Sequence, residues 1–204
     1  MTEILSLPVV APIAIFTFVA SITPGPNNIM LAASGLQYGF RQTLPHIVGI
    51  QLGFNLLILL AYLGISQLLL NLPGALLLLR LLGSAYLLYL AWKILGITFV
   101  SSSHPEKARP LTIWQAGLFQ FANPKAWIIS TSAMALAIPL VGSADNAWLT
   151  LCLSWPAIGF LCNCLWVLGG TKLNGYLNNT QQRRIICCAL AIITLLTVTM
   201  FWLT

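Results

Sequence analysis

The chain has little charge, and acidic residues are the scarcest of all. Only 6% of its 204 residues are charged and only three are Asp or Glu, whereas 59% are hydrophobic. A soluble domain of this length needs far more charge, so the composition excludes that class and indicates a membrane protein. The net charge of +6 comes mainly from basic residues in the loops between apolar stretches, and gives no reason to expect a nucleic-acid partner.

Several kinds of chemistry have no support in the sequence. No Asp or Glu lies in any long apolar stretch. The stretches therefore offer neither a carboxylate proton relay nor an acidic cation site. A ligand with two basic groups is disfavoured, because its second ammonium would have no carboxylate partner there. There is no phosphate-binding loop, zinc-protease motif or nucleophile elbow, so we expect no catalytic residue, cofactor or metal. Residues 1–151 contain no cysteine, and the five cysteines all lie in the last two apolar stretches. That distribution is not a secreted disulfide scaffold, and buried small side chains explain it more simply.

Six apolar windows dominate what is present. Each reaches or exceeds the ~20 residues that a helix needs to cross a bilayer. They are Val9–Leu36, Leu44–Leu70, Gly74–Leu95, Ile113–Val141, Trp148–Gly169 and Ile185–Leu203. The prediction is an all-α membrane protein whose six transmembrane helices form a single transmembrane domain over residues 1–204.

The basic residues predict the orientation of this domain. Seven of the nine Lys and Arg fall in or beside the first, third and fifth loops, namely Arg41, Lys93, Lys107, Arg109, Lys172, Arg183 and Arg184. Cytoplasmic loops carry the excess of Lys and Arg, so these loops should be cytoplasmic and both termini periplasmic. The first residues include no basic cluster, and the first helix is therefore expected to be retained rather than cleaved as a signal.

Two apolar windows are interrupted by helix-breaking residues 100 positions apart. The first break is Thr23-Pro24-Gly25-Pro26-Asn27-Asn28 and the second is Asn123-Pro124-Lys125. Aligning them gives two three-helix repeats, residues 1–100 and 111–204, joined by a cytoplasmic linker at 101–110. Three is an odd number, so the second repeat must be inverted. Broken helices at equivalent places in inverted repeats mark the substrate site of many secondary transporters.

Each break has the residues of a helix start. Thr23 and Asn123 are good N-cap residues, and Pro24 and Pro124 suit the first helical position. The half-helices that follow should begin near the bilayer centre, where their free N–H groups and dipoles favour an anion such as a substrate carboxylate. Proline kinks also occur in membrane helices without any functional role.

Lys125 lies near the predicted midplane, where a charge is costly and should face the protein interior. It can pair with a substrate carboxylate or carry a proton, since buried lysines shift their pKa readily. The structural alternative is an ammonium bonded to backbone carbonyls that the first break frees. Asn27 and Asn28 are likewise open to two uses, ligand contacts or hydrogen bonds between helices.

The second helix has the pattern of a central helix. Gln51 and Asn55 share one face, while Gly49 and Gly53 form a G-x-x-x-G pair on nearly the opposite face. The glycines would allow another helix to approach closely, and the amides should avoid lipid. We include Gln51 and Asn55 among the substrate-binding candidates.

Three further polar positions receive individual interpretations. Asn163, with Gly159, is expected to be the fifth-helix counterpart of the amides and glycines of the second helix. Asn163 completes the set of substrate-binding candidates. Arg80 is expected to extend to the external interface. His46, at the cytoplasmic start of the second helix, is expected to be an ordinary exposed histidine.

Four segments of the sequence together resemble the lysine exporter (LysE/RhtB) family of bacterial amino-acid exporters. They are Ile22-Thr23-Pro24-Gly25-Pro26-Asn27-Asn28, Gly39-Phe40-Arg41-Gln42, Gly83-Ser84-Ala85-Tyr86-Leu87-Leu88-Tyr89-Leu90-Ala91-Trp92-Lys93 and Phe121-Ala122-Asn123-Pro124-Lys125-Ala126. The second segment and Leu90-Ala91-Trp92-Lys93-Ile94 are most similar to the cysteine and O-acetylserine exporter branch. The resemblance implies export of small neutral amino acids across the bacterial inner membrane by exchange with protons. Cysteine-related compounds, homoserine and threonine all stay open as substrates.

Two other classes of protein compete with this interpretation. A transmembrane thiol oxidoreductase would use paired cysteines, but would want them in both halves of the chain. A non-transporting assembly protein would use the breaks only to shape a helix interface. Pairs such as Gly35 and Gly39 could serve either a homodimer or internal packing.

Overall fold

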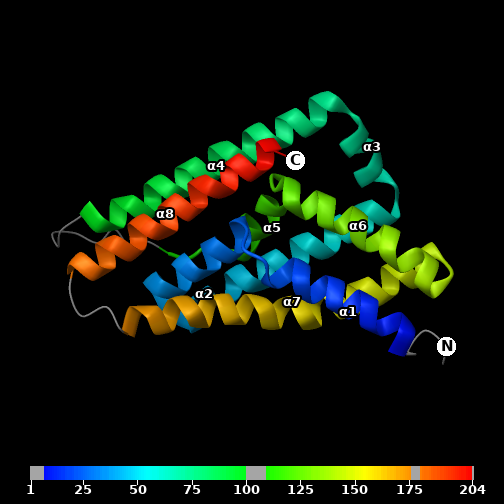
Figure 1. Ribbon diagram of the computed structural model, residues 1–204, viewed down its shortest axis with the longest axis horizontal. Coiled ribbons are helices and arrows are strands. Elements are labelled where there is room, and N and C mark those ends of the chain that lie inside the picture. The colour runs from blue at the N-terminus through cyan, green and yellow to red at the C-terminus, as the bar shows by residue number, and fades with distance from the viewer. Residues whose placement is uncertain (1–6, 100–108, 176–179, 204) are drawn as a thin grey trace.

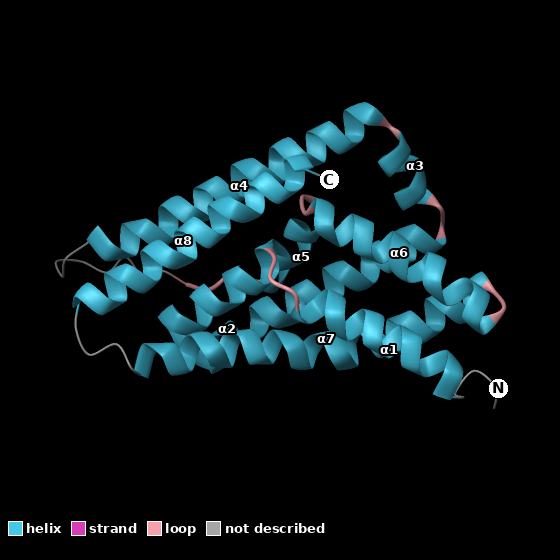
Figure 2. Ribbon diagram, viewed as in Figure 1, coloured by secondary structure: helices cyan, strands magenta, loops and turns pink. Residues whose placement is uncertain are grey.

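The computed structural model describes residues 7–99, 109–175 and 180–203. All regular structure in these ranges is α-helical (Figure 2). The helices are α1 (Leu7–Ile22), α2 (Pro26–Tyr62), α3 (Ile65–Asn71), α4 (Pro73–Phe99), α5 (Ile113–Phe121), α6 (Pro124–Val141), α7 (Ala144–Gly175) and α8 (Thr180–Leu203). The all-α prediction is confirmed for the described residues.

Both predicted breaks interrupt the helices. The first apolar window is divided between α1 and α2 by residues 23–25, and the fourth is divided between α5 and α6 by residues 122–123. Figure 1 shows each pair of segments following one another along the molecule, with both breaks near its middle. The two interruptions therefore come close together although 100 residues separate them.

The loop predicted between the first two windows is reduced to a sharp bend at Gly39. This residue has φ 77° and ψ 174° inside α2, a conformation that only glycine adopts without strain. The two arms of α2 fold against each other there: the hydroxyls of Ser34 and Thr43 lie 3.0 Å apart, and Leu31 shares a buried cluster with Ile47. The bend turns α2 into two antiparallel arms (Figure 1).

Glycines bring α2 into backbone contact with its neighbours. A Cβ on Gly35 would overlap the Val167 carbonyl of α7, and one on Gly170 would overlap the Ala32 carbonyl of α2. In the same way Gly49 and Gly53 face the backbone of α5. The predicted close approach of a helix to the Gly49–Gly53 pair is thus confirmed, and Gly35 is used for packing within the chain.

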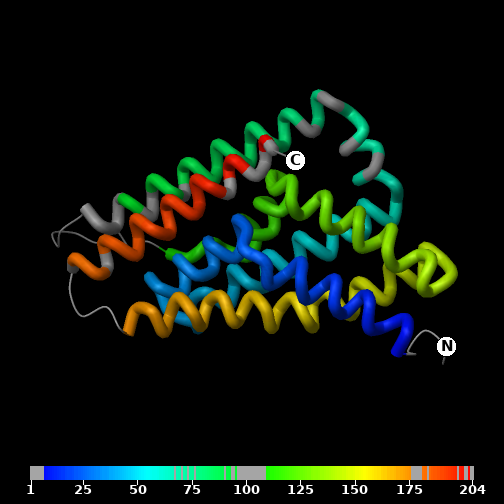
Figure 3. Tube along the Cα trace, in the orientation of Figure 1, coloured from blue at the N-terminus to red at the C-terminus, as the bar shows by residue number. Residues whose placement is uncertain are grey.

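Helices α4 and α8 form a separate layer beside this core. They run side by side along one flank of the molecule (Figure 3), and the indole Nε1 of Trp202 donates a hydrogen bond to the Ser84 hydroxyl at 3.1 Å. A small cluster that includes Leu36, Ala91 and Cys187 connects the layer to α2.

The exposed surface suits a lipid environment. Leu153, Leu161 and Leu165 of α7 are 72%, 64% and 56% exposed, a pattern that water would disfavour and lipid would not. Among the described residues, α2, α6 and α7 are long and apolar enough to cross a membrane, and shorter apolar helices accompany them. The chain is therefore a multi-pass membrane protein.

Candidate functional site

The first break differs from its prediction at the residues that cap α2. The helix begins at Pro26 with Gly25 as its N-cap, and Gly25 is fully extended at φ −174° and ψ 177°. The interpretation of Thr23 as N-cap and Pro24 as first helical residue is wrong. Proline disfavours helical φ and ψ angles in the residue before it. Gly25 precedes Pro26 and is extended for this reason, so the helix begins at Pro26 and not at Pro24. The Thr23 hydroxyl instead donates to the Ala20 carbonyl at 3.2 Å.

The second break follows its prediction. Asn123 is the N-cap of α6, and its side-chain oxygen accepts a hydrogen bond from the Lys125 amide at 3.1 Å. Pro124 takes the first helical position. The indole of Trp127 donates to the Phe121 carbonyl at 2.9 Å, which satisfies an acceptor that the end of α5 leaves free. This break is therefore fixed at both of its ends.

Lys125 joins the two breaks. Its ammonium donates to the Thr23 carbonyl at 3.3 Å, to the Thr23 hydroxyl at 3.2 Å and to the Pro24 carbonyl at 3.2 Å. These oxygens come from the unwound segment between α1 and α2, where no helical N–H competes for them. In this conformation the bonds match the structural alternative for Lys125, and all three ammonium protons have acceptors.

The two asparagines that follow the first break also make hydrogen bonds within the protein. Asn28 donates from Nδ2 to the carbonyls of Ser21 and Thr23, both at 2.8 Å. Asn27 exchanges two hydrogen bonds with Gln120 of α5, at 2.8 and 3.1 Å. Gln120 is completely buried and was absent from the predicted set, although a lone amide in an apolar window is a recognisable signal of an interior contact.

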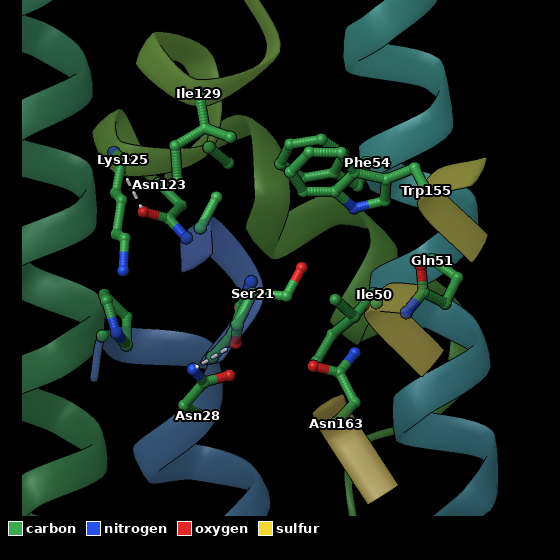
Figure 4. Close-up of a pocket in the computed structure, with 16 residues that line it drawn as sticks. Ser21, Asn28, Ile50, Gln51, Phe54, Asn123, Lys125, Ile129, Trp155 and Asn163 are labelled. Atoms are coloured by element: carbon green, nitrogen blue, oxygen red, sulfur yellow. Dashed lines mark hydrogen bonds between the residues drawn. The ribbon is translucent and has the colours of Figure 1, made fainter. Parts of the chain in front are cut away.

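A cavity of about 50 Å³ lies between the breaks and the central helices (Figure 4). Its walls come from α1, α2, α6 and α7. The predicted residues that line it are Gly25, Pro26, Asn27, Asn28, Gln51, Asn123, Lys125 and Asn163. Sequence reasoning missed the remaining polar or aromatic lining residues, which are Ser21, Phe54 and Trp155.

Four predicted residues do not line this cavity. Thr23 and Pro24 contribute to the site only through the oxygens that bind Lys125, and Pro124 and Asn55 face elsewhere. The structure therefore brings two-thirds of the predicted set to one cavity.

The wall opposite Lys125 combines an aromatic stack with an unpaired amide oxygen. The rings of Phe54 and Trp155 are parallel within 7° and 4.0 Å apart. Beside them, the Gln51 Oε1 is buried without a partner among the described residues. A Cβ on Gly159 would lie only 3.1 Å from the Gln51 Nε2, so glycine at 159 gives that amide its space. An ammonium cation at one wall and a free acceptor at the other suit a zwitterion.

The expectation for His46 is wrong. Its side chain is only 1% exposed, because the first arm of α2 and the segment Arg109–Leu111 cover it. The histidine lies outside the central cavity.

The cysteines and other metal-binding side chains form no cluster in the described residues. The five cysteines form no disulfide, and no group of three described His, Cys, Asp or Glu side chains lies close enough to hold a metal ion. Cys162 and Cys187 are both buried, and Cys187 belongs to an apolar cluster with Leu36 and Ala91.

Comparison with known proteins places this chain in a family. The family model described as LysE type translocator matches residues 18–202. The chain belongs to this family. The LysE-type chain is thus a transporter and not an enzyme, which rules out the thiol oxidoreductase interpretation.

Curated relatives of this LysE-type translocator include proteins named cysteine/O-acetylserine efflux protein. Those from Escherichia coli strain K12 and from Shigella flexneri are 33% identical over 157 residues, covering 76% of this chain and 78% of the relative. A third, from Escherichia coli O1:K1, is 32% identical over the same lengths. No solved structure matches the chain.

Proposed function

We propose that this protein exports small neutral amino acids from the cytoplasm in exchange for protons. The observation that carries the proposal is the cavity between the two breaks, where the Lys125 ammonium faces buried amides and no described carboxylate. The relatives named as cysteine/O-acetylserine efflux proteins favour those two compounds as first candidates, with homoserine and threonine next.

The cavity contains complementary groups for an amino-acid zwitterion. The substrate carboxylate would replace the Thr23 and Pro24 oxygens at Lys125, exchanging long hydrogen bonds of 3.2–3.3 Å for a charge-assisted pair. The substrate ammonium would bind the free Gln51 oxygen on the opposite wall. Asn163 lines the same wall and would orient the side chain of the substrate.

Proton exchange would use the same lysine. Lys125 is the described ionisable side chain of the cavity, which makes it the candidate proton carrier. Exchange requires a bound proton and a bound substrate to exclude one another. A neutral Lys125 would leave the Thr23 and Pro24 oxygens free for the substrate ammonium, and reprotonation from the periplasm would restore its bonds to those oxygens and displace the substrate. This role of Lys125 is the alternative to pairing its ammonium with the substrate carboxylate.

The membrane topology that fits this function has six crossings in two inverted three-helix repeats, residues 1–100 and 111–204. The two broken helices, α1 with the first arm of α2 and α5 with α6, would be equivalent members of the repeats. The distribution of Lys and Arg supports a cytoplasmic linker at 101–110 and periplasmic termini. The membrane in this proposal is the bacterial inner membrane. Reporter fusions after Thr204 and within the linker should report opposite sides.

Uptake into inverted membrane vesicles tests the substrate and the coupling together. In such vesicles export becomes uptake, and radiolabelled cysteine, O-acetylserine, homoserine, threonine and lysine would be compared with and without an imposed pH gradient. The proposal predicts saturable uptake of at least one neutral compound, accelerated by the gradient, and none of lysine. Absence of uptake and of binding across the whole panel would contradict the proposed export of small neutral amino acids.

A further inference from the structure

A second polar cavity of about 50 Å³ lies where the two arms of α2 meet the segment that leads into α5. It has no lining residue in common with the central cavity. Its polar lining residues are Ser34, Gln37, Tyr38, His46 and Arg109. By the distribution of basic loops it would be on the cytoplasmic side, between the cytoplasm and the central site.

His46 is the unusual member of this group. Its side chain is 1% exposed, yet both ring nitrogens are buried without a hydrogen-bond partner among the described residues. A neutral imidazole needs one acceptor and one donor, and leaving them unmet is costly. The contents of the cavity must therefore supply the missing bonds, either as water or as a ligand.

The groups around His46 favour an anionic ligand. Arg109 is exposed at the edge of the cavity and presents a planar set of donors suited to a carboxylate. Tyr38 and Gln37 add donors from the first arm of α2, and the Ser34 hydroxyl is already shared with Thr43. None of the described lining residues is acidic, so no described carboxylate of the cavity neutralises the guanidinium.

We propose that the Arg109–His46 cavity is a second binding site, which takes the carboxylate of a small amino acid before it reaches the central cavity. The guanidinium would bind the carboxylate, and the His46 ring would donate one hydrogen bond to it from the buried side. The inference rests on the proposed export function, since only a substrate arriving from the cytoplasm would meet this site first.

Histidine side-chain NMR on the intact protein in lipid nanodiscs provides the test. The chain has two histidines, so a His104→Gln background leaves His46 as the single reporter. Sodium acetate is titrated at constant pH and ionic strength, with acetamide as the uncharged analogue of the same shape. A saturable change in the His46 ring ¹⁵N shifts with acetate, and none with acetamide, is expected.

Three variants make the result specific. Arg109→Gln should weaken acetate binding about tenfold or more, as expected for loss of a charged hydrogen-bonding partner. Arg41→Gln, an exposed arginine outside the cavity, should bind as the parent does. Lys125→Met should also keep the shift, which separates this site from the central one. Both Arg variants alter exposed side chains, so their folding is not at risk.

The proposal is overturned by any of three results: no saturable shift, an equal response to acetamide, or an unchanged affinity in Arg109→Gln. A response that disappears in Lys125→Met protein that has inserted and folded would also overturn it, because His46 would then be reporting the central site. Vesicle uptake by the parent protein decides the export function separately, so active uptake without a His46 response refutes only this second site.

Discussion

Replacing Lys125 by Met removes the ammonium that connects the two breaks while keeping most of the side-chain volume. The three lost hydrogen bonds measure 3.2–3.3 Å, longer than the 2.7–2.9 Å of strong charge-assisted bonds. At the lower end of the range for charged groups, about 1.5 kcal/mol each, they contribute roughly 4–5 kcal/mol. Removing a charge from the membrane interior returns about 2.5–3.5 kcal/mol. The net loss of stability should therefore be only about 1–2 kcal/mol.

Transport should respond far more strongly than stability. Truncating one member of a buried charge pair costs about 2–5 kcal/mol, so substrate binding should fall about 30-fold or more at 1.4 kcal/mol per tenfold. Uptake into inverted vesicles, normalised to the amount of inserted protein, measures this loss. Lys172→Met is the matched control, because Lys172 is exposed in the last turn of α7 and its loss should leave uptake unchanged.

Two results would refute this reasoning about Lys125. Undiminished uptake in Lys125→Met would mean that the ammonium does not bind substrate or couple protons. Failure of the variant to insert or fold would mean that its bonds to the first break are mainly structural, as the observed geometry by itself allows.

Three further predictions concern the packing and the cavity. Gly170→Ala should lower the stability by about 1–3 kcal/mol or more through overlap with backbone, seen as a lower Tm in detergent, whereas Gly169→Ala, whose Cβ would meet nothing, should not. Gln120→Leu should lower the free energy of unfolding by about 1–3 kcal/mol, because it leaves Asn27 unpaired. The double variant with Asn27→Leu should lose less stability than the sum of the two single variants. Strict additivity in thermal unfolding would contradict the amide pair. Gly159→Ala should displace the neighbouring Gln51 amide and raise KM for export about 2- to 10-fold, the range for one neutral hydrogen bond. Its Tm should change little. An unchanged KM would mean that the Gln51 amide does not bind substrate.

Much of the helical arrangement could be predicted because it depends on local chemistry. The second break was placed correctly since Asn123 and Pro124 act within one turn of chain. The start of α2 was misplaced by two residues because two prolines, Pro24 and Pro26, both fit the first position. Only the restriction that Pro26 imposes on Gly25 decides between them.

Tertiary contacts account for the other differences. His46 is buried because a segment more than 60 residues away covers it, and nothing near it in the sequence signals that cover. Gln120 and Asn27 meet across 93 residues, so their pairing could not be predicted from either helix alone. The direction of each side chain around the cavity depends on how the arms of α2 bend at Gly39.

The interlocked glycines of α2 and α7 have a kinematic consequence. Backbones in contact at Gly35 and Gly170 cannot slide past each other without first separating, so the first arm of α2 and α7 must move as one body. The interruptions at residues 23–25 and at residues 122–123 lie outside this body. A transport cycle built on this chain would therefore move α1 and α6 about a fixed central pair of helices.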